Sequence, residues 1–383
     1  MTATLASPPA PKPAQAKANP YPWYSPRFWH GMRPGPWWAL CWRHRFRIHP
    51  LRWPMAFLIS IINPINVIAG AAQRVRYGRL IDETRIKEPP VFIIGHWRSG
   101  TTYLHELMHL DSRFVSPTTY QCFAPHHFLL TQWLMHNLGS WLMPKQRPMD
   151  NMAAGWDRPQ EDEFALLTLG APTPYFRMAF PNEEPPYSEF LDMQGCSAED
   201  QARFERALVD FVKLLTFASP GKRLLLKSPP HTGRIEVLSR LFPGAKFIHI
   251  TRNPYSLFPS TTRLWHSLDE VQGLQFPKDV GLDEYVFDCL TRMYRGFEDQ
   301  RQRLDPAAIY DVKYEDLIAD PTSEIGRIYE TLGLGEYDTV RNAIAVAAGK
   351  QKDYKANKHE LDESLQAKIR QRWAAYFEKY GYS

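Results

Sequence analysis

The chain has 383 residues, of which 44% are hydrophobic, so it can bury a large core and fold as one large α/β domain or as two smaller ones. A formal charge of +5 suits an anionic ligand or an anionic lipid surface, but this excess is too small and too scattered for a nucleic-acid-binding protein. The four cysteines are far apart and form no C-x-x-C pair, which favours free thiols in a reducing, cytoplasmic compartment over a disulfide framework.

The first segment, 1–22, consists mostly of Ala, Pro, Lys and Gln and has almost nothing to bury, so we expect it to be disordered. It lacks the basic start, apolar centre and cleavage site of a signal peptide.

The next segment, 23–85, is rich in tryptophan and arginine, and we expect it to be helical. Its stretch 54–73 carries no charge and is strongly apolar, although Asn63, Pro64 and Asn66 interrupt it, and arginines flank it on both sides. Such a composition favours a helix that lies in a membrane interface, with contact to the cytoplasmic face of the membrane through residues 37–79. The alternatives are a helical hairpin packed on the rest of the protein and a true membrane span.

Residues 91–110 are typical of a short buried strand, a loop bounded by Gly95 and Gly100, and a helix. Such a loop points backbone N–H groups and the positive end of a helix dipole at one place, which predicts an anion cradle, most often for phosphate. Thr101 stands where the loop of nucleotide triphosphatases has its lysine, so the cation is Arg98 instead. Further hydroxyl donors come from Ser99, Thr101 and Thr102.

Three more short apolar strands are predicted at 223–227, 247–250 and 308–314, with amphipathic helices between and after them. This alternation predicts an α/β fold with a parallel sheet and helices on both faces, and ligands of such sheets bind at the carboxyl ends of the strands. We therefore expect one site that contains the residues following three of the strands, namely Arg98, Lys227 with His231, and Arg252.

These segments together resemble the sulfotransferases that use 3′-phosphoadenosine 5′-phosphosulfate, particularly the branch with a P-R-S-G-T-T loop. The loop here reads HWRSGTT, with Trp97 where that branch often has proline. In TRNPYSLFPS, Arg252 precedes Ser260 by eight positions, the interval of the family's 3′-phosphate pair. RLLLKSPPHT and VKYEDLIADP resemble two further family segments. The resemblance implies a P-loop-like sheet in a sulfotransferase domain spanning 86–383.

The resemblance also implies roles for individual residues. The donor would be 3′-phosphoadenosine 5′-phosphosulfate, no metal would be needed, and Arg98 would steady the leaving bridging oxygen. The residues implied in donor binding are Arg98, Ser99, Gly100, Thr101, Thr102, Tyr103, Arg252 and Ser260.

The general base that takes the acceptor's proton is less clearly marked. Relatives of this branch often have a glutamate some twenty residues after the loop, where this chain has Gln121. The candidates are therefore His231, which we favour because an imidazole titrates near neutral pH, and one carboxylate of the run Glu161, Asp162, Glu163. The expected catalytic set is Arg98, Lys227, His231 and Glu163. Each candidate also has a non-catalytic interpretation. His231 could be a structural histidine, and the three acids could complement the dipole of the helix that follows them.

The acceptor is expected to be a hydrophobic or lipid alcohol. Trp133, Trp141, Trp156, Phe128 and Phe180 suggest an apolar pocket, and a membrane-attached segment would bring the enzyme to a lipid. Residues 350–360 are basic and could close over the nucleotide or be a solvated face.

Three other functions remain open. His105 to His109 spell the H-E-x-x-H motif of zinc hydrolases. A nucleotide kinase or ATPase would use a similar loop, although the lysine is missing. A membrane-attached module that only binds the nucleotide is the non-enzymatic alternative.

Overall fold

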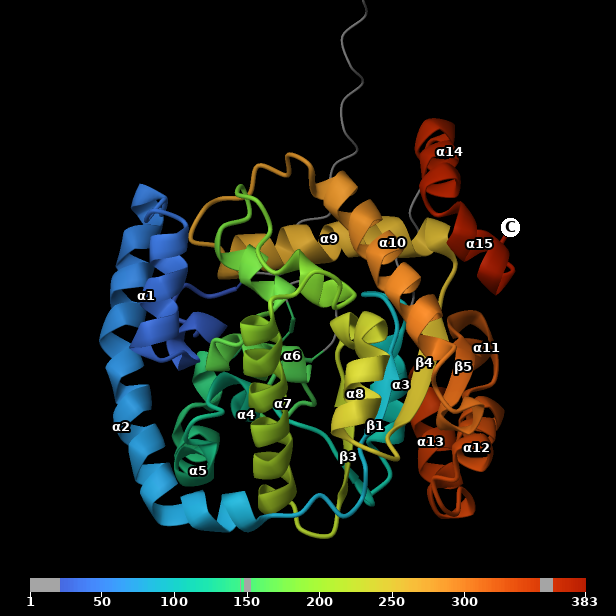
Figure 1. Ribbon diagram of the computed structural model, residues 1–383, viewed down its shortest axis with the longest axis horizontal. Coiled ribbons are helices and arrows are strands. Elements are labelled where there is room, and N and C mark those ends of the chain that lie inside the picture. The colour runs from blue at the N-terminus through green and yellow to red at the C-terminus, as the bar shows by residue number, and fades with distance from the viewer. Residues whose placement is uncertain (1–20, 145, 148–152, 352–360) are drawn as a thin grey trace, which may run out of the picture.

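A five-stranded parallel sheet forms the centre of the molecule in the computed structural model, which describes residues 21–144, 146–147, 153–351 and 361–383 (Figure 1). The strand order is β2-β3-β1-β4-β5, so β1 lies in the middle, with β3 on one side and β4 on the other. The strands are β1 (Val91–Ile94), β2 (Phe114–Val115), β3 (Arg223–Lys227), β4 (Lys246–Thr251) and β5 (Ile309–Lys313).

The two faces of the sheet enter two different hydrophobic clusters, because successive side chains of a strand point to opposite sides. Val91 and Ile93 of β1 pack in a cluster with residues of α3, α12 and α13. Phe92 and Ile94 pack on the other face, in a larger cluster that includes residues of α6 to α10. Helices therefore cover both faces, and the predicted architecture is confirmed (Figure 1).

The helices of the first half are α1 (Pro34–Arg43), α2 (Trp53–Glu83), α3 (Thr101–Met108), α4 (Thr119–Phe123), α5 (Phe128–Leu138), α6 (Asp162–Leu169) and α7 (Ala198–Ala218). Those of the second half are α8 (Ile235–Leu241), α9 (Pro254–Gln272), α10 (Leu282–Arg301), α11 (Tyr314–Ala319), α12 (Pro321–Leu332), α13 (Asp338–Gln351), α14 (Glu363–Arg372) and α15 (Ala374–Tyr380). Short 3-10 helices are η1 (Phe28–Gly31), η2 (Pro50–Arg52), η3 (Ser140–Leu142), η4 (Pro174–Ala179), η5 (Ser188–Leu191), η6 (Pro229–Arg234) and η7 (Pro306–Ala308).

The strands at 223–227, 247–250 and 308–314 lie where the sequence predicts them, within one residue at each end. The two-residue edge strand β2 escaped prediction because it is too short to show an alternating pattern. The expectations for residues 1–22 and 350–360 fall almost entirely outside the described residues.

The tryptophan- and arginine-rich segment forms a helical hairpin of α1 and α2 that packs along one side of the molecule (Figure 1). Trp29, Trp37 and Ile59 of this layer are fully buried in the same cluster as β1. The stretch Pro50–Glu83 is long and apolar enough to cross a membrane by length and composition, and 28% of its most apolar window is buried. The helices pack on the rest of the protein as a hairpin, and membrane contact of this segment stays a prediction.

The helix α2 turns three amide side chains towards the protein, whereas most of its large apolar residues lie on the outside. Its buried positions include Ala56, Ile59, Asn63, Asn66, Gly70 and Gln73, which recur every three or four residues and therefore share one face. The Asn66 amide donates to the carbonyls of His30 and Met32, at 2.7 Å each, and its Oδ1 lies 3.0 Å from His127 Nε2. Gln73 Oε1 accepts from the Leu129 amide. This polar face attaches the helix to the rest of the protein.

Replacing Asn66 by alanine should lower the free energy of unfolding by about 2–4 kcal/mol, because two buried carbonyls and His127 would lose their partner. The neighbouring Ile65→Ala is the matched control and should cost less than about 0.5 kcal/mol, because Ile65 is exposed. Urea denaturation of both variants measures the difference. A larger loss for Ile65→Ala than for Asn66→Ala would contradict this account of α2.

Candidate functional site

The loop between β1 and α3 is held open by residues in left-handed backbone conformations. Gly95, Arg98 and Gly100 all have positive φ, at 144°, 69° and 106°. A Cβ on Gly95 would lie 2.4 Å from the Ile250 carbonyl oxygen, and one on Gly100 would lie 2.3 Å from the Tyr314 ring. Both glycines are thus required by space as well as by conformation. Arg98 is a non-glycine residue in this region, and such local strain is concentrated at functional sites.

The two predicted binding segments meet at this loop. The Arg98 Nε donates to Ser260 Oγ at 3.0 Å, and Arg252 Nη1 donates to the Arg98 carbonyl at 2.9 Å. The Arg252 guanidinium also lies over the Tyr314 ring, 4.4 Å from its centre. These contacts lie where β1 and β4 end and the chain order of the sheet reverses, which is the usual ligand crevice of an open parallel sheet. Two half-buried arginines are thereby gathered at one place.

The loop offers donors that suit an anion. Ser99 is fully buried, and its Oγ has no hydrogen-bond partner, an exception for a buried hydroxyl. Thr101, Thr102 and Tyr103 form the first turn of α3, whose N-terminus carries the positive end of the helix dipole. A phosphate-like group in the loop would give the Ser99 hydroxyl an acceptor, so the residues present fit the anionic end of the donor that the sequence implies.

Next to the loop lies a row of three buried acid–base pairs that joins α6 to the residues after β3. Glu161 Oε1 accepts from Lys227 Nζ at 2.7 Å, and Asp162 Oδ2 lies 2.6 Å from His231 Nε2. Glu163 accepts two hydrogen bonds from the Arg234 guanidinium, at 2.7 and 2.9 Å. The three consecutive acids thus each have a partner from the last residue of β3 or from the turn after it.

The members of the row differ in how far solvent or a substrate can reach them. The side chains of Asp162, Glu163, His231 and Arg234 are fully buried, whereas the Glu161 side chain keeps 12% of its surface exposed. Asp162 also accepts from Ser228, and Glu163 also accepts from Thr173 at 2.5 Å. Glu163 and His231, expected to be catalytic, are therefore enclosed in hydrogen-bonded pairs. Glu161 is the most exposed member of the row, and the Lys227 side chain beside it is buried.

Burial and charge shift several pKa values in this row. Burial lowers the pKa of Lys227, and the Glu161 carboxylate beside it acts in the opposite direction. Burial alone would raise the pKa of Asp162, but the charge and hydrogen bond of His231, with the hydrogen bond from Ser228, bring it below the ordinary value. Burial and the Glu161 charge raise the pKa of Tyr175 well above its ordinary value, so its hydroxyl stays protonated and donates to Glu161.

A link between the loop and this row was missed in the sequence. The Trp97 indole N–H donates to the Tyr175 hydroxyl at 2.9 Å, and that hydroxyl in turn donates to Glu161. The only available signal was the tryptophan that replaces the usual proline in the loop. Tyr175 lies far away in the sequence, on η4, and no pattern there marks it.

The C-terminal segment supports the Arg252 side of the site. The Tyr376 hydroxyl contacts both the amide and the carbonyl of Arg252, at 3.1 and 3.3 Å. Tyr382 bonds through its hydroxyl to Thr251 and to Glu315, and Glu315 accepts from the Asn253 amide. The turn after β4, which contains Arg252, is therefore held in position by residues near the C-terminus.

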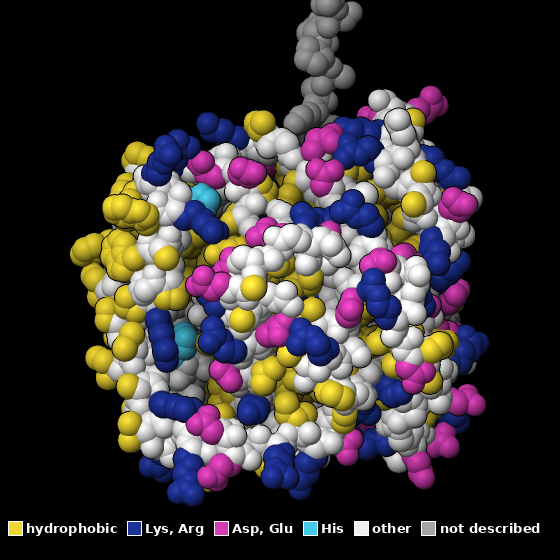
Figure 2. Space-filling model, in the orientation of Figure 1, with side chains coloured by type: hydrophobic (Ala, Val, Ile, Leu, Met, Phe, Trp, Pro, Cys, Tyr) yellow, Lys and Arg dark blue, Asp and Glu magenta, His cyan; other side chains and the backbone are white. Residues whose placement is uncertain are grey.

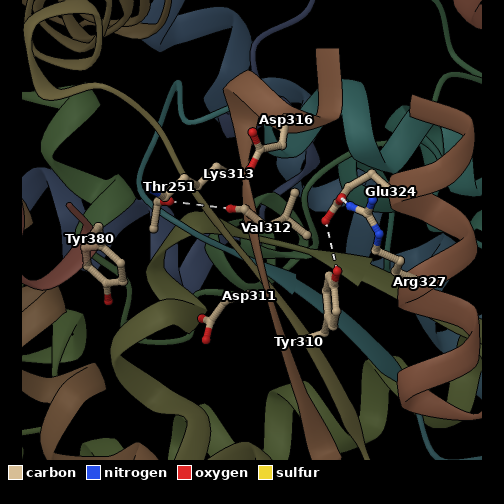
Figure 3. A pocket seen from close by; sticks show the side chains of 9 residues that line it. All are labelled: Thr251, Tyr310, Asp311, Val312, Lys313, Asp316, Glu324, Arg327 and Tyr380. Atoms are coloured by element: carbon tan, nitrogen blue, oxygen red, sulfur yellow. Dashed lines mark hydrogen bonds and ion pairs between the residues drawn. The ribbon is translucent and has the colours of Figure 1, made fainter. Parts of the chain in front are cut away.

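A shallow pocket opens beside the edge strand β5 (Figure 3). Its lining includes the carboxylates Asp311, Asp316 and Glu324, with Lys313 and Arg327 between them. Arg327 pairs with Glu324 at 2.6 Å. An anion would meet three carboxylates here, so this pocket is not the predicted nucleotide site.

The aromatic residues expected to form one pocket differ in burial in the structure. Phe128, Trp156 and Phe180 are buried, whereas Trp133 and Trp141 are exposed. Spacing alone could not distinguish core aromatics from surface ones.

The H-E-x-x-H histidines lie on α3. His105 Nε2 contacts Ser116 Oγ at 2.7 Å, and its ring centre is 6.4 Å from that of His109. Among the described residues, no group of three or more His, Cys, Asp or Glu side chains is placed to hold a metal ion.

Comparison with known proteins gives one consistent result. The sequence model of the sulfotransferase family matches residues 89–339. The chain is 40% identical over 360 residues to the omega-hydroxy-beta-dihydromenaquinone-9 sulfotransferase Stf3 of Mycobacterium bovis and to that of Mycobacterium tuberculosis, covering 94% of this chain and 92% of each relative.

Solved structures agree on the fold. The crystal structure of sulfotransferase STF9 from Mycobacterium avium superposes with a TM-score of 0.62 at 19% identity, covering 91% of this chain and 96% of that one. Sulfotransferase STF1 from Mycobacterium tuberculosis gives a TM-score of 0.61 at 18% identity, over 90% and 94% of the two chains.

Replacing Gly100 by alanine should lower the free energy of unfolding by about 2 kcal/mol or more and close the loop to anions, because the new Cβ meets the Tyr314 ring and φ is 106°. Gly349→Ala in α13 is the matched control. Nothing lies within 4 Å of its Cβ, so stability should stay level or rise by up to about 1 kcal/mol. Thermal melts of both variants measure the difference in stability, and equal melting temperatures would refute the proposed steric requirement.

Proposed function

The chain belongs to the sulfotransferase family, and we propose that it transfers a sulfuryl group from 3′-phosphoadenosine 5′-phosphosulfate to the hydroxyl of a hydrophobic or lipid alcohol. It is an enzyme of the sulfotransferase class, so the kinase, zinc hydrolase and binding-module alternatives are set aside. The observation that carries the proposal for the donor is the meeting of Arg98, Arg252 and Ser260 at the ends of β1 and β4. Four free cysteines support a cytoplasmic location.

We assign the 5′ end of the donor to the loop and its 3′-phosphate to Arg252 and Ser260. The unpartnered Ser99 hydroxyl and the start of α3 support the first assignment. The Arg252 guanidinium and the Ser260 hydroxyl support the second, because a phosphate binds well to arginine through paired N–H donors. When bound, the donor supplies the sulfuryl group.

In this mechanism Arg98 neutralises charge on the leaving bridging oxygen. The acceptor oxygen forms its bond to sulfur while the bond from sulfur to the bridging oxygen breaks, and the acceptor proton passes to a base. Charge spreads over the sulfuryl oxygens during transfer, so fixed donors such as Arg98, Ser99 and Lys227 contribute most where that charge develops. No step requires a metal ion.

We propose Glu161 as the base, in place of His231 or Glu163. Its carboxylate is the most exposed member of the acid–base row, and the Tyr175 hydroxyl connects it to the loop through Trp97. Lys227 would hold Oε1 and leave a lone pair of the carboxylate for the acceptor proton. His231, with its Nε2 on Asp162, would position this group by fixing the turn after β3.

The acceptor assignment rests on the relatives that are 40% identical, whose name gives a hydroxylated dihydromenaquinone as their substrate. We infer an acceptor of the same chemical class, with a long apolar part and one primary or secondary hydroxyl.

Calorimetric titration with adenosine 3′,5′-bisphosphate in EDTA tests the donor site. Arg252→Ala should weaken binding about 10- to 100-fold, because one charge-assisted contact to phosphate is lost. Arg341→Ala removes an exposed arginine of α13 and should leave binding unchanged. Binding of ATP in preference to the bisphosphate, or equal affinity in all three proteins, would overturn the assignment.

Glu161→Gln should lower kcat by a factor of about 100 to 10,000 while the affinity for the bisphosphate stays near that of the natural protein. Glu163→Gln is the matched control. It breaks the buried pair with Arg234, so it should lower stability by about 3 kcal/mol while the folded enzyme keeps most of its kcat. If Glu163→Gln loses more kcat than Glu161→Gln, the base has been assigned wrongly.

Transfer of a labelled sulfuryl group to lipid extracts and to soluble sugars tests the acceptor. Labelled product should form with the lipid fraction and disappear after the hydroxyls of that fraction are acetylated. Product with soluble sugars alone would refute the lipid acceptor and leave the donor assignment intact.

A further inference from the structure

The outer face of α2, defined by Phe57, Ile61, Ile65 and Ile68, is an apolar surface that no described part of the chain covers. These residues are 67%, 53%, 57% and 71% exposed. Their spacing of four, four and three places them on one side of the helix. Figure 2 shows apolar side chains gathered over α1 and α2 at the left edge of the molecule.

This arrangement is the reverse of an ordinary surface helix, which buries its apolar stripe and exposes polar residues. In α2 the inner face carries Asn63, Asn66 and Gln73, and the outer face carries the large apolar side chains. A helix surrounded by water on its outer side would leave this apolar area exposed, which is unfavourable. Large exposed apolar patches of this kind mark interaction sites.

The charge of the same layer indicates what covers the face. Residues 21–81 hold nine arginines and no aspartate or glutamate, and the first acids, Asp82 and Glu83, come at the end of α2, where they pair with Arg74 and Arg79. Exposed arginines lie towards both ends of α2, among them Arg45 before it and Arg76 near its C-terminal end. Tryptophans border the N-terminal end of the face, with Trp38, Trp42 and Trp53 all exposed. Apolar side chains bordered by tryptophan and arginine match an anionic lipid interface, where the rings lie at headgroup level.

We propose that the outer face of α2 docks the protein on an anionic lipid surface, with the helix lying in the plane of the membrane. Docking inserts the four apolar side chains among the acyl chains and sets the arginines against lipid phosphates. The helix does not span the bilayer, because Asn66 and Gln73 hold its inner face on the protein through buried hydrogen bonds. A second copy is a poor occupant, because pairing this face would bring together two layers that each carry an excess of arginine over acidic residues.

The docked layer adjoins the catalytic row. Phe28, which precedes the buried Trp29, stacks on Phe164 of α6 at 4.2 Å between ring centres, one residue after Glu163. Docking would therefore bring α6 and the catalytic row close to the lipid surface that holds a membrane-dissolved alcohol. This last consequence rests on the proposed function, whereas docking itself does not.

Flotation of the full-length protein with vesicles of phosphatidylcholine and phosphatidylglycerol, free of any acceptor, tests the proposal. The natural protein should float with these vesicles and bind pure phosphatidylcholine more weakly. The combined variant Ile61→Glu, Ile65→Glu, Ile68→Glu should bind at least about tenfold more weakly. Arg45→Gln and Arg76→Gln should each weaken binding to the anionic vesicles about fivefold.

Val346→Glu is the matched control, because it adds one charge at an exposed apolar position of α13, on the opposite side of the molecule (Figure 1). It should float like the natural protein. Thermal melts and binding of adenosine 3′,5′-bisphosphate should be equal in all these proteins, which shows that the fold and the donor site are intact. Since the vesicles hold no acceptor, failure of the proposed lipid substrate would leave this result unaffected.

Three outcomes would overturn the proposal. The first is a natural protein that does not float with either vesicle, and the second is a triple variant that floats equally well. The third is a stable dimer of the natural protein, seen by light scattering without lipid, that the triple variant converts to monomer. Resistance of the vesicle-bound protein to extraction at alkaline pH would show a span and would equally refute a helix lying in the membrane plane.

Discussion

The pairing of Glu161, Asp162 and Glu163 with Lys227, His231 and Arg234 is the constraint on which the site depends. An unpaired charge at such depth would be expensive, so the three acids can lie there only if α6 stays against the turn after β3. The pairs therefore fix the position of α6 relative to the sheet. They also leave one carboxylate, Glu161, close to the loop while they enclose the other two.

The loop after β1 depends on a different constraint, which is close backbone approach. Gly95 lies against the Ile250 carbonyl, and Gly100 lies against Tyr314, so the ends of β1, β4 and β5 are drawn together around the loop. Tyr376 and Tyr382 then hold the Arg252 turn from the C-terminal segment. The proposed anion site thus combines residues from four distant parts of the chain.

The helical hairpin of α1 and α2 relates the proposed lipid acceptor to the proposed docking on a lipid surface. The inner face of α2 combines the core residues Ala56 and Ile59 with three amide side chains, two of which hydrogen-bond to the protein, and its outer face is apolar and open. Hydrophobic burial within the chain cannot explain the outer face, whereas contact with lipid would. The lipid acceptor and the lipid-facing helix are inferred from different observations. They are consistent with each other, because docking on a membrane would bring the enzyme to a lipid substrate.

The sequence by itself determined the elements whose signals are local. The strand, glycine loop and helix at 91–110 and the apolar strands predicted a parallel sheet, and the resemblance in the Arg98 loop and the Arg252–Ser260 interval predicted the family. Only the tertiary structure decided which acid is accessible, because burial of Glu163 and His231 depends on partners more than sixty residues apart. The tertiary structure also decided the orientation of α2. Its sequence is apolar nearly throughout, so no periodicity marks the inner face. That face is determined by amide side chains such as Asn66 and Gln73, because they form hydrogen bonds with backbone carbonyls and amides of the protein.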